Sequence, residues 1–249
     1  MESMKILDVR VDRVNRTQAL EQCVNGMEDK APFVVVTPNS EIVVRANEDA
    51  RLKQIIEQAN LVVPDGIGLV IGSKIVKKPL TERVTGIDLM GALLNHANET
   101  KKTVYLLGGK PGIAEKAGKN IVSQHPNLIL LGTHHGYFSG VHTGKKGHVE
   151  EKQIVEEIAS QKPDLLFVAL GAPGQEYFID TYKSVLNAKL LMGVGGSLDV
   201  ISGEVKRAPE FYQKAGLEWL YRLIKEPSRI GRMAALPKFM IKVIFSKKG

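Results

Sequence analysis

The sequence has little of what marks secreted or membrane-spanning proteins. Its 249 residues include a single cysteine, Cys23, which excludes an intramolecular disulfide framework and fits a reducing cytoplasm. No stretch approaches the roughly 18–20 apolar residues that a membrane-spanning helix needs. Residues 1–14 alternate charged and apolar side chains and lack the apolar region of a signal peptide. We therefore expect the protein to lie in the cytoplasm.

The sequence also lacks the usual signatures of nucleotide cofactors and metal sites. It contains no Gly-Lys-Ser or Gly-Lys-Thr of the Walker type and no Asp-x-Asp. Two glycine clusters, at 108–112 and 193–196, lack the full dinucleotide-binding spacing, so they support a dehydrogenase only weakly. One cysteine and one histidine pair, His134 and His135, give a metal site poor support. We expect neither a metal nor another cofactor.

Six short apolar runs each end abruptly in a polar motif marked by glycine or proline. Such runs are typical of strands buried on both faces of a parallel sheet. Helical spacing lies between several of them, over 41–57, 87–97, 112–123 and 149–160, while the polar stretch 139–148 is expected to be an exposed loop of little chemistry. This alternation predicts an α/β fold, with a doubly wound, mostly parallel Rossmann-like sheet and helices on both faces. The apolar runs are 33–36, 61–63, 104–107, 128–131, 165–170 and 190–192.

The polar motifs that follow these runs should converge, although they are scattered along the chain. Parallel strands present their carboxyl ends at one edge of the sheet, and open α/β sheets bind ligands at that edge. This arrangement favours an enzyme over a scaffold protein.

The positive charge is concentrated at the carboxyl end. Residues 1–199 contain 23 Lys and Arg against 23 Asp and Glu, and residues 200–249 contain 11 against 4, so the net charge of +7 falls in the last fifth. Near residue 202 the strand-like runs give way to short basic helical stretches. We expect a catalytic core over 1–199 and a basic helical appendage over 200–249. Such helices can lie on an anionic membrane, dock on a neutral core or bind nucleic acid.

Two charged residues stand at positions suited to catalysis. Asp65 follows a strand directly, between Pro64 and Gly66, where a carboxylate can act as a general base. The same tripeptide is also a strong turn former. Arg83 precedes a helix and can hold a phosphate or a sugar oxygen, and its alternative is a salt bridge with Glu82 or another acid.

Neutral polar side chains follow other strands. Thr37 and Asn39 suit sugar hydroxyls or an acetamido group, or else they cap the following helix. Gln175 can bind a sugar hydroxyl, while the neighbouring Glu176 can simply begin a helix.

A third group of candidates surrounds the last glycine cluster. Residues 193–197, with Asp199 after them, are typical of a turn that binds a phosphate or a nucleoside through backbone N–H groups. Of the adjacent His134 and His135, at most one should face the cleft, together with Tyr137, because neighbouring strand residues point to opposite faces.

Taken together, these motifs resemble the WecG/TagA/CpsF glycosyltransferases, glycosyltransferase family 26, of bacterial envelope polymer synthesis. The resemblance runs from about residue 9 to residue 244, and it is carried by the order and number of the motifs. They are Thr-Pro-Asn-Ser-Glu at 37–41, Val-Pro-Asp-Gly-Ile-Gly at 63–68, Glu-Arg-Val-Thr-Gly at 82–86, Gly-Thr-His-His-Gly-Tyr-Phe at 132–138, Ala-Leu-Gly-Ala-Pro at 169–173, Gly-Val-Gly-Gly-Ser at 193–197, Lys-Arg-Ala-Pro at 206–209 and Leu-Glu-Trp-Leu-Tyr-Arg at 217–222.

The resemblance implies a reaction. N-acetylmannosamine would pass from UDP to undecaprenyl-diphosphate-linked N-acetylglucosamine, with inversion and without a metal. In the TagA-like branch the product is the β-linked disaccharide of the wall teichoic acid linkage unit. Such an enzyme would work peripherally, on the inner face of the cytoplasmic membrane.

The resemblance also implies residue roles. Asp65 would be the general base, and it forms the catalytic group with Arg83 and Thr37. The sugar pocket would be lined by Thr37, Asn39, Arg83 and Gln175, and the UDP would be held by Gly195, Gly196 and Asp199, with Tyr137 nearby. Basic positions of the appendage would neutralise the diphosphate of the UDP or of the lipid, and these are Arg222, Arg229 and Arg232.

Other interpretations remain open. A transferase of the same family could use UDP-N-acetylmannosaminuronic acid or another UDP-sugar. A nicotinamide-dependent oxidoreductase is disfavoured by the glycine spacing. A non-enzymatic binder of membrane or nucleic acid would leave the strand-end motifs unexplained. The resemblance implies an anionic membrane surface, and no nucleic acid, as the partner of the basic appendage. Assembly into a homo-oligomer is compatible with the sequence.

Overall fold

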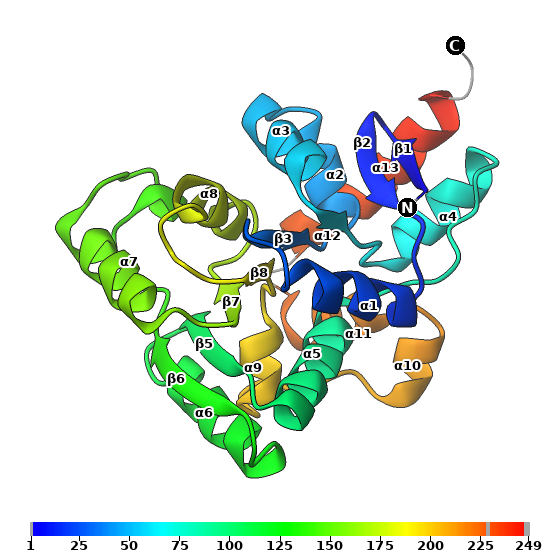
Figure 1. The fold of residues 1–249 in the computed structure, drawn as a ribbon. Helices are drawn as coiled ribbons and strands as arrows, with labels where there is room; N and C mark the ends of the chain where they lie inside the picture. The colour runs from blue at the N-terminus through cyan, green and yellow to red at the C-terminus, as the bar shows by residue number, and fades with distance from the viewer. Residues whose placement is uncertain (1, 228–229, 247–249) are drawn as a thin grey trace.

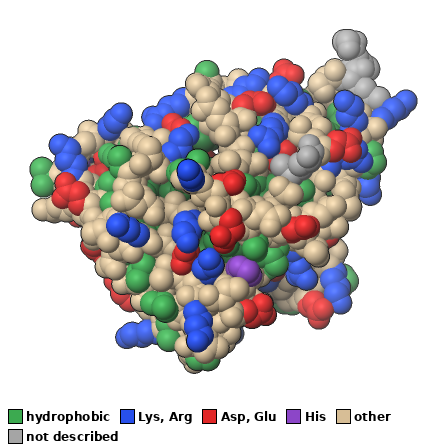
Figure 2. Space-filling view, in the orientation of Figure 1, with side chains coloured by type: hydrophobic (Ala, Val, Ile, Leu, Met, Phe, Trp, Pro, Cys, Tyr) green, Lys and Arg blue, Asp and Glu red, His purple; other side chains and the backbone are tan. Residues whose placement is uncertain are grey.

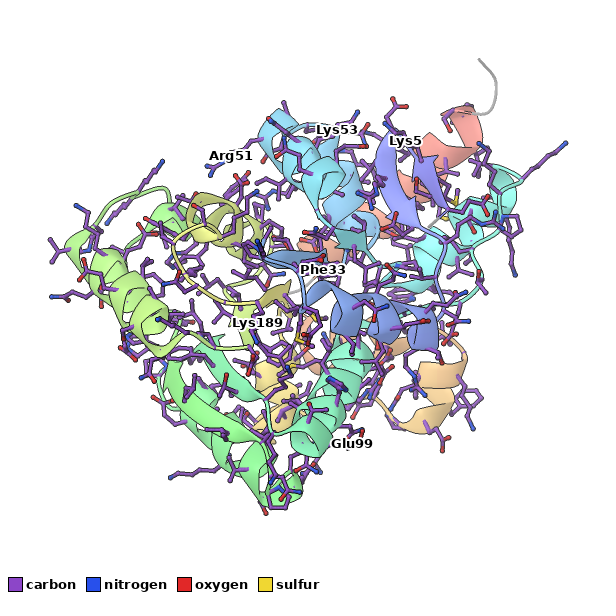
Figure 3. All side chains as sticks on the ribbon, viewed as in Figure 1. Lys5, Phe33, Arg51, Lys53, Glu99 and Lys189 are labelled. Carbon is purple, nitrogen blue, oxygen red and sulfur yellow. The ribbon has the colours of Figure 1, made fainter. Side chains whose placement is uncertain are left out.

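A six-stranded parallel sheet forms the centre of the computed structural model, which describes residues 2–227 and 230–246 (Figure 1). All six predicted strands are present, in the order β4-β3-β8-β7-β5-β6. Figure 3 shows Phe33 and Lys189 side by side at the amino ends of neighbouring strands, where Phe33 N donates to Lys189 O at 2.8 Å. The strands are β3 (Phe33–Val36), β4 (Leu61–Val62), β5 (Thr103–Gly108), β6 (Ile129–His134), β7 (Leu165–Ala169) and β8 (Leu190–Gly193).

Alternate strand residues enter two separate cores. In β3, Val34 and Val36 pack into the core on one face, while Phe33 and Val35 pack into the core on the other. Because side chains alternate along a strand, a continuous apolar run is what a sheet covered on both faces requires. The doubly wound arrangement expected from the sequence is therefore confirmed.

Helices cover both faces of this sheet. The first core takes side chains from α2, α3, α7 and α8, and the second from α1, α5, α6 and α9. The helices preceding residue 202 are α1 (Arg16–Gly26), α2 (Ser40–Ala46), α3 (Ala50–Gln58), α4 (Ile67–Ile75), α5 (Gly86–Thr100), α6 (Ile113–Gln124), α7 (Val149–Gln161), α8 (Gly174–Tyr182) and α9 (Ser197–Ile201).

The helical stretch expected over 41–57 is two helices, so that prediction was wrong in its continuity. Asp49 is the N-cap of α3, and its side chain accepts from the backbone N–H of Leu52 at 3.0 Å. Asn47 donates its side-chain amide to Val43 O at 2.9 Å and so closes the end of α2. Short polar side chains compete with the backbone for such bonds, and they end one helix and begin the next.

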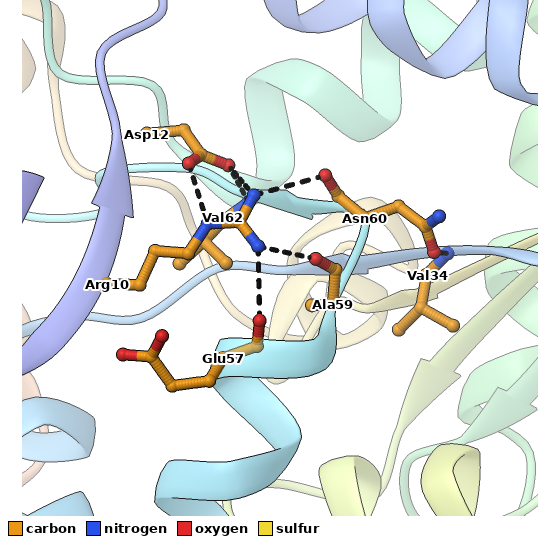
Figure 4. Close-up of polar contacts among 7 residues, drawn as sticks. All are labelled: Arg10, Asp12, Val34, Glu57, Ala59, Asn60 and Val62. Carbon is orange, nitrogen blue, oxygen red and sulfur yellow. Dashed lines mark hydrogen bonds and ion pairs between the residues drawn. The ribbon is translucent and has the colours of Figure 1, made fainter. Parts of the chain in front are cut away.

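A hairpin of β1 (Ser3–Ile6) and β2 (Val9–Asp12) packs beside the outer strand β4 and was not predicted (Figure 4). The fully buried Asp12 accepts from the backbone N–H of Val62 at 2.8 Å and pairs with Arg10 at 2.9 Å. Arg10 also donates to the carbonyls of Glu57 and Ala59. A buried ion pair is tolerated when its remaining hydrogen-bonding groups are satisfied, as here.

The loop at 139–148 is more ordered than predicted. Gly140 and Val141 are buried, and a short 3-10 turn, η1, spans Val141–Thr143. The buried Glu151 accepts from the backbone N–H groups of Val141 at 2.6 Å and Gly147 at 2.9 Å. The expectation of an exposed loop was thus wrong for its first residues, because a carboxylate on α7 draws the backbone inward. Residues 143–148 are exposed.

The carboxyl-terminal segment consists of short helices that return to the core. Phe239 and Val243 of α13 are buried in the first core, beside α2 and α4. A Cβ on Gly72 of α4 would lie 3.0 Å from the Phe239 ring, so the glycine permits close packing. Within the described residues, no helix is long and apolar enough to cross a bilayer. The helices are α10 (Glu210–Lys214), α11 (Glu218–Lys225), α12 (Ile230–Met233) and α13 (Ala235–Ser246).

Candidate active site

The predicted polar motifs meet at the carboxyl ends of the central strands. Thr37, after β3, donates its hydroxyl to the carbonyl of Gly193 at the end of β8, at 3.3 Å. Asp65, after β4, donates its backbone N–H to Pro38 O at 3.1 Å. Gln175, after β7, accepts from the backbone N–H of Gly195 at 3.0 Å. Residues far apart in the sequence therefore form one site, as parallel strands require.

Asp65 lies at the amino terminus of α5, next to Thr37. The backbone N–H of Gly86 donates to Asp65 Oδ2 at 3.4 Å. A Cβ on Gly86 would lie 3.4 Å from Thr37 Oγ1 and 3.6 Å from Asp65 Oδ2, so both oxygens face this glycine. The hydroxyl and the carboxylate thus flank the same point of the backbone, where the positive end of the helix dipole favours an anion.

The environment of Asp65 raises its pKa toward neutral pH. Burial raises the pKa of Asp65 to about 6, against the lowering effects of the Gly86 N–H, Arg83 and Arg222, and the negative charge of Glu218 adds to the increase. Part of the residue's surface remains accessible. A carboxylate with a pKa close to the working pH is well suited to accept a proton in catalysis.

Arg83 is engaged by the appendage. Its guanidinium pairs with Glu218 of α11 at 2.9 Å and donates to Gln213 O at 3.0 Å. Glu218 also faces Arg207 at 3.6 Å, and Arg207 pairs with Asp88 of α5 at 2.7 Å. The salt-bridge alternative for Arg83 is therefore realised, with Glu218 as the partner in place of Glu82. This ion-pair network fixes α11 to the core.

The same network accounts for the position of Arg222. It lies one helical turn after Glu218 on α11, and its charge acts on Asp65. Arg229 lies outside the described residues. Arg232 is in α12, and its side chain is also outside the described part.

No cluster of three or more His, Cys, Asp or Glu able to hold a metal ion occurs among the described residues.

Two predicted sugar-pocket residues have structural roles. Asn39 caps α2, accepting from the backbone N–H of Ile42 at 3.0 Å, and it borders the Asp65 turn because a Cβ on Gly66 would lie 3.4 Å from Asn39 Cβ. Gln175 is 3% exposed, and its Nε2 donates to Glu176 at 2.9 Å. The sequence indicates only that Glu176 can begin a helix. In the structure it is a buried hydrogen-bond partner of Gln175.

The glycine turn and Tyr137 lie differently with respect to Asp65. Gly195 has φ +50°, and a Cβ on Gly196 would lie 3.6 Å from Asp199 Oδ2, so these residues form one compact turn at the end of β8. Tyr137 is 65% exposed and follows β6, whereas Asp65 follows β4, and these two strands are the opposite edges of the sheet. Tyr137 therefore lies away from Asp65, and its expected place near the UDP stays a prediction.

The sequence profile of the WecG/TagA/CpsF glycosyl transferase family matches residues 4–249. The chain belongs to this family. Three relatives carry the name N-acetylglucosaminyldiphosphoundecaprenol N-acetyl-beta-D-mannosaminyltransferase. The Bacillus spizizenii protein is 36% identical over 87% of this chain and 80% of its own length. The Staphylococcus aureus protein is 36% identical over 98% of this chain and 92% of its own length. The Bacillus subtilis protein is 36% identical over 89% of this chain and 83% of its own length.

Membership in the WecG/TagA/CpsF family agrees with the family resemblance of the sequence motifs. It also gives the convergent strand ends a common purpose, because a glycosyl transferase must hold a donor and an acceptor around one reacting carbon.

Proposed function

We propose that this protein transfers N-acetylmannosamine from UDP to N-acetylglucosamine linked to undecaprenyl diphosphate, with inversion. The observation that carries the proposal is the environment of Asp65: a carboxylate with a pKa of about 6, beside Thr37 and under the influence of Arg83 and Arg222. The names of the relatives from Bacillus and Staphylococcus support this choice of acceptor and sugar. The product would be the disaccharide that begins a wall teichoic acid linkage unit.

The reaction needs one base and a stabilised leaving group. Asp65 takes the proton of the acceptor hydroxyl as its oxygen attacks the anomeric carbon, and the bond from that carbon to the UDP oxygen breaks with its electron pair on UDP. A single in-line displacement inverts the configuration. Arg222 and the other cations of the appendage offset the negative charge that develops on the diphosphate, which is the role that a metal has in other transferases. We therefore propose that no metal is required.

UDP release tests this proposal. The protein is incubated with UDP-N-acetylmannosamine and a short-chain prenyl-diphosphate N-acetylglucosamine in the presence of chelator, and a reaction without acceptor is the control. Release that depends on the acceptor is expected. No release with this donor, but release with UDP-N-acetylmannosaminuronic acid, would assign the sister reaction. That reaction calls for a cation in the sugar pocket, and the candidate Arg83 already pairs with Glu218.

The acidity of Asp65 predicts the acidic limb of the pH profile. Because the base must be ionised, and its pKa is raised from 3.8 to about 6, kcat/KM should fall as the pH drops through about 6. Below that point the loss should be about tenfold per pH unit. Initial rates of UDP release between pH 4.5 and pH 8 measure this, and a limb centred near pH 4 would contradict the assigned environment.

We further propose that the appendage holds the enzyme on an anionic membrane surface. Several of its apolar side chains are exposed, among them Ile241 at 56%, Ile244 at 49% and Phe245 at 61%. The face drawn in Figure 2, by contrast, intersperses basic and acidic side chains and offers no broad surface of one charge. Apolar side chains beside basic ones favour the headgroup region of a bilayer. The basic neighbours on α13 are Lys238 and Lys242, which also pair with Glu48 at 2.6 Å and 3.7 Å.

Vesicle binding tests the membrane proposal. Ile241→Ser should weaken binding to vesicles of phosphatidylglycerol and phosphatidylcholine about tenfold, because an exposed Ile contributes on the order of 1–2 kcal/mol when it enters the lipid. Ile129→Ser is the matched control, since Ile129 is 50% exposed on the far strand β6. Cosedimentation measures both variants, and an equal loss in the control would argue against a specific role of α13.

A further inference from the structure

We infer that Glu176 is a positioning residue whose side chain holds the Gln175 amide in the orientation that fixes the glycine turn at 193–196. The inference rests on the proposed function, in which UDP is the leaving group, and on the expectation that the turn at 193–196 holds UDP. The contacts that carry it run from the start of α8, through two buried side chains, to the end of β8.

The contacts are direct and protected from water. Glu176 Oε1 accepts from Gln175 Nε2 at 2.9 Å, and Gln175 Oε1 accepts from the backbone N–H of Gly195 at 3.0 Å. Gln175 is 3% exposed and Glu176 is 2% exposed. Hydrogen bonds in such surroundings compete little with solvent, and breaking one leaves a buried polar group without a partner.

Chemistry at both ends fixes which way the Gln175 amide points. The backbone N–H of Gly195 is a donor only, so it requires the amide oxygen. An ionised carboxylate is an acceptor only, so Glu176 requires the amide nitrogen. If Glu176 were replaced by an apolar residue, nothing at that end would prevent the amide from rotating by half a turn and placing its N–H₂ against the N–H of Gly195.

The strand end next to Gln175 is shaped for this arrangement. A Cβ on Gly193 would lie 2.5 Å from Gln175 Nε2, so any larger residue would displace the amide. On its other side, the carbonyl of Gly193 accepts from Thr37 Oγ1 at 3.3 Å. The Glu176–Gln175 pair therefore contacts the strand end that also holds the hydroxyl next to Asp65.

The contact persists through neutral pH. Burial raises the pKa of Glu176 to about 7, although Gln175, a backbone N–H and Arg45 favour the ionised form. Within the described structure Glu176 Oε2 is buried and has no hydrogen-bond partner, so it can carry the proton while Oε1 continues to accept from Gln175. A neutral carboxyl group and a glutamine side chain are alike in this respect, and that similarity supplies the conservative variant for the test.

A double-mutant cycle tests the inference, with UDP itself as the probe. Calorimetry measures the Kd of UDP for the unaltered protein, Glu176→Met, Gln175→Met and the double variant. Methionine keeps the approximate volume and removes the polar head. Glu176→Met should weaken UDP binding about tenfold, the value of about one hydrogen bond. In the Gln175→Met background it should have no further effect, because its partner is already missing. Glu176→Gln should recover most of the affinity.

Several outcomes would overturn the inference. A purely structural role of Glu176 would lower the melting temperature and weaken UDP binding by the same factor in both backgrounds. Unchanged UDP binding by Glu176→Met would also contradict it. Should that variant fail to fold, Gln175→Glu combined with Glu176→Gln reverses donor and acceptor, and it must bind UDP better than Gln175→Glu alone. No UDP binding by the unaltered protein would contradict the proposed function and, with it, this role of the turn.

Discussion

Replacing Asp65 with asparagine should lower turnover by about 10²–10⁴-fold, the range typical of a lost general base. Asparagine keeps the shape of the side chain. Its amide oxygen can still accept from the backbone N–H of Gly86, which lies 3.4 Å from Asp65 Oδ2 in the unaltered protein. It can no longer take a proton from the acceptor. The affinity for UDP should change little, because the glycine turn and Arg222 remain in place. Single-turnover rates and UDP calorimetry on the same preparation measure the two quantities.

Asp180→Asn is the matched control for this substitution. Asp180 is on α8 of the α/β core, and within the described part of the chain its ion-pair partner is Lys183, the C-cap of that helix, at 3.0 Å. Its loss of charge should leave turnover near that of the unaltered protein. If Asp65→Asn retained more than about one tenth of the activity, Asp65 would not be the base.

Replacing Phe239 with alanine should lower the free energy of unfolding by about 3–5 kcal/mol, the usual cost of removing a buried phenylalanine. Phe239 is fully buried in the first core, and its ring packs against Gly72 of α4. Denaturant titration followed by tryptophan fluorescence or circular dichroism measures the change.

Phe245→Ala, in the same helix, is the control for Phe239→Ala. Phe245 is 61% exposed, so its substitution should change stability by less than about 0.5 kcal/mol. The two variants should also differ on vesicles, where the loss of Phe245 weakens binding and the loss of Phe239 does not, as long as the protein is folded. Equal stabilities for both would mean that α13 does not belong to the core.

The strands and the convergence of the site could be predicted because both depend on local patterns. A run such as Phe33–Val36 is apolar at every position, and only a strand covered on both faces needs that. The motifs after such strands must then share one edge. What could not be predicted is the lateral order of the strands. β8 lies between β3 and β7, and β6 lies at the far edge, so Gly195 is near the Asp65 turn and Tyr137 is not.

The ion-pair partners of the charged residues could not be predicted from the sequence either. The neighbour of Arg83 in the chain is Glu82, yet its ion-pair partner is Glu218, which only the folded appendage brings close. Glu176 was obscured for the opposite reason. It directly follows Gln175, and an acidic residue in the first turn of a helix is so common that it did not suggest a buried contact. Its role can be inferred only from the structure, where Glu176 is buried and its partner Gln175 accepts a hydrogen bond from Gly195.

The return of α13 to helices α2 and α4 sets an order of events during protein synthesis. The strands and helices of the core leave the ribosome first, but the apolar surface that receives Phe239 and Val243 stays open until residues 235–246 follow. A nascent chain that stalls before this point exposes this apolar surface, to which chaperones can bind. Completion of this part of the fold and exposure of the outward-facing apolar side chains of α13 therefore fall in the same step.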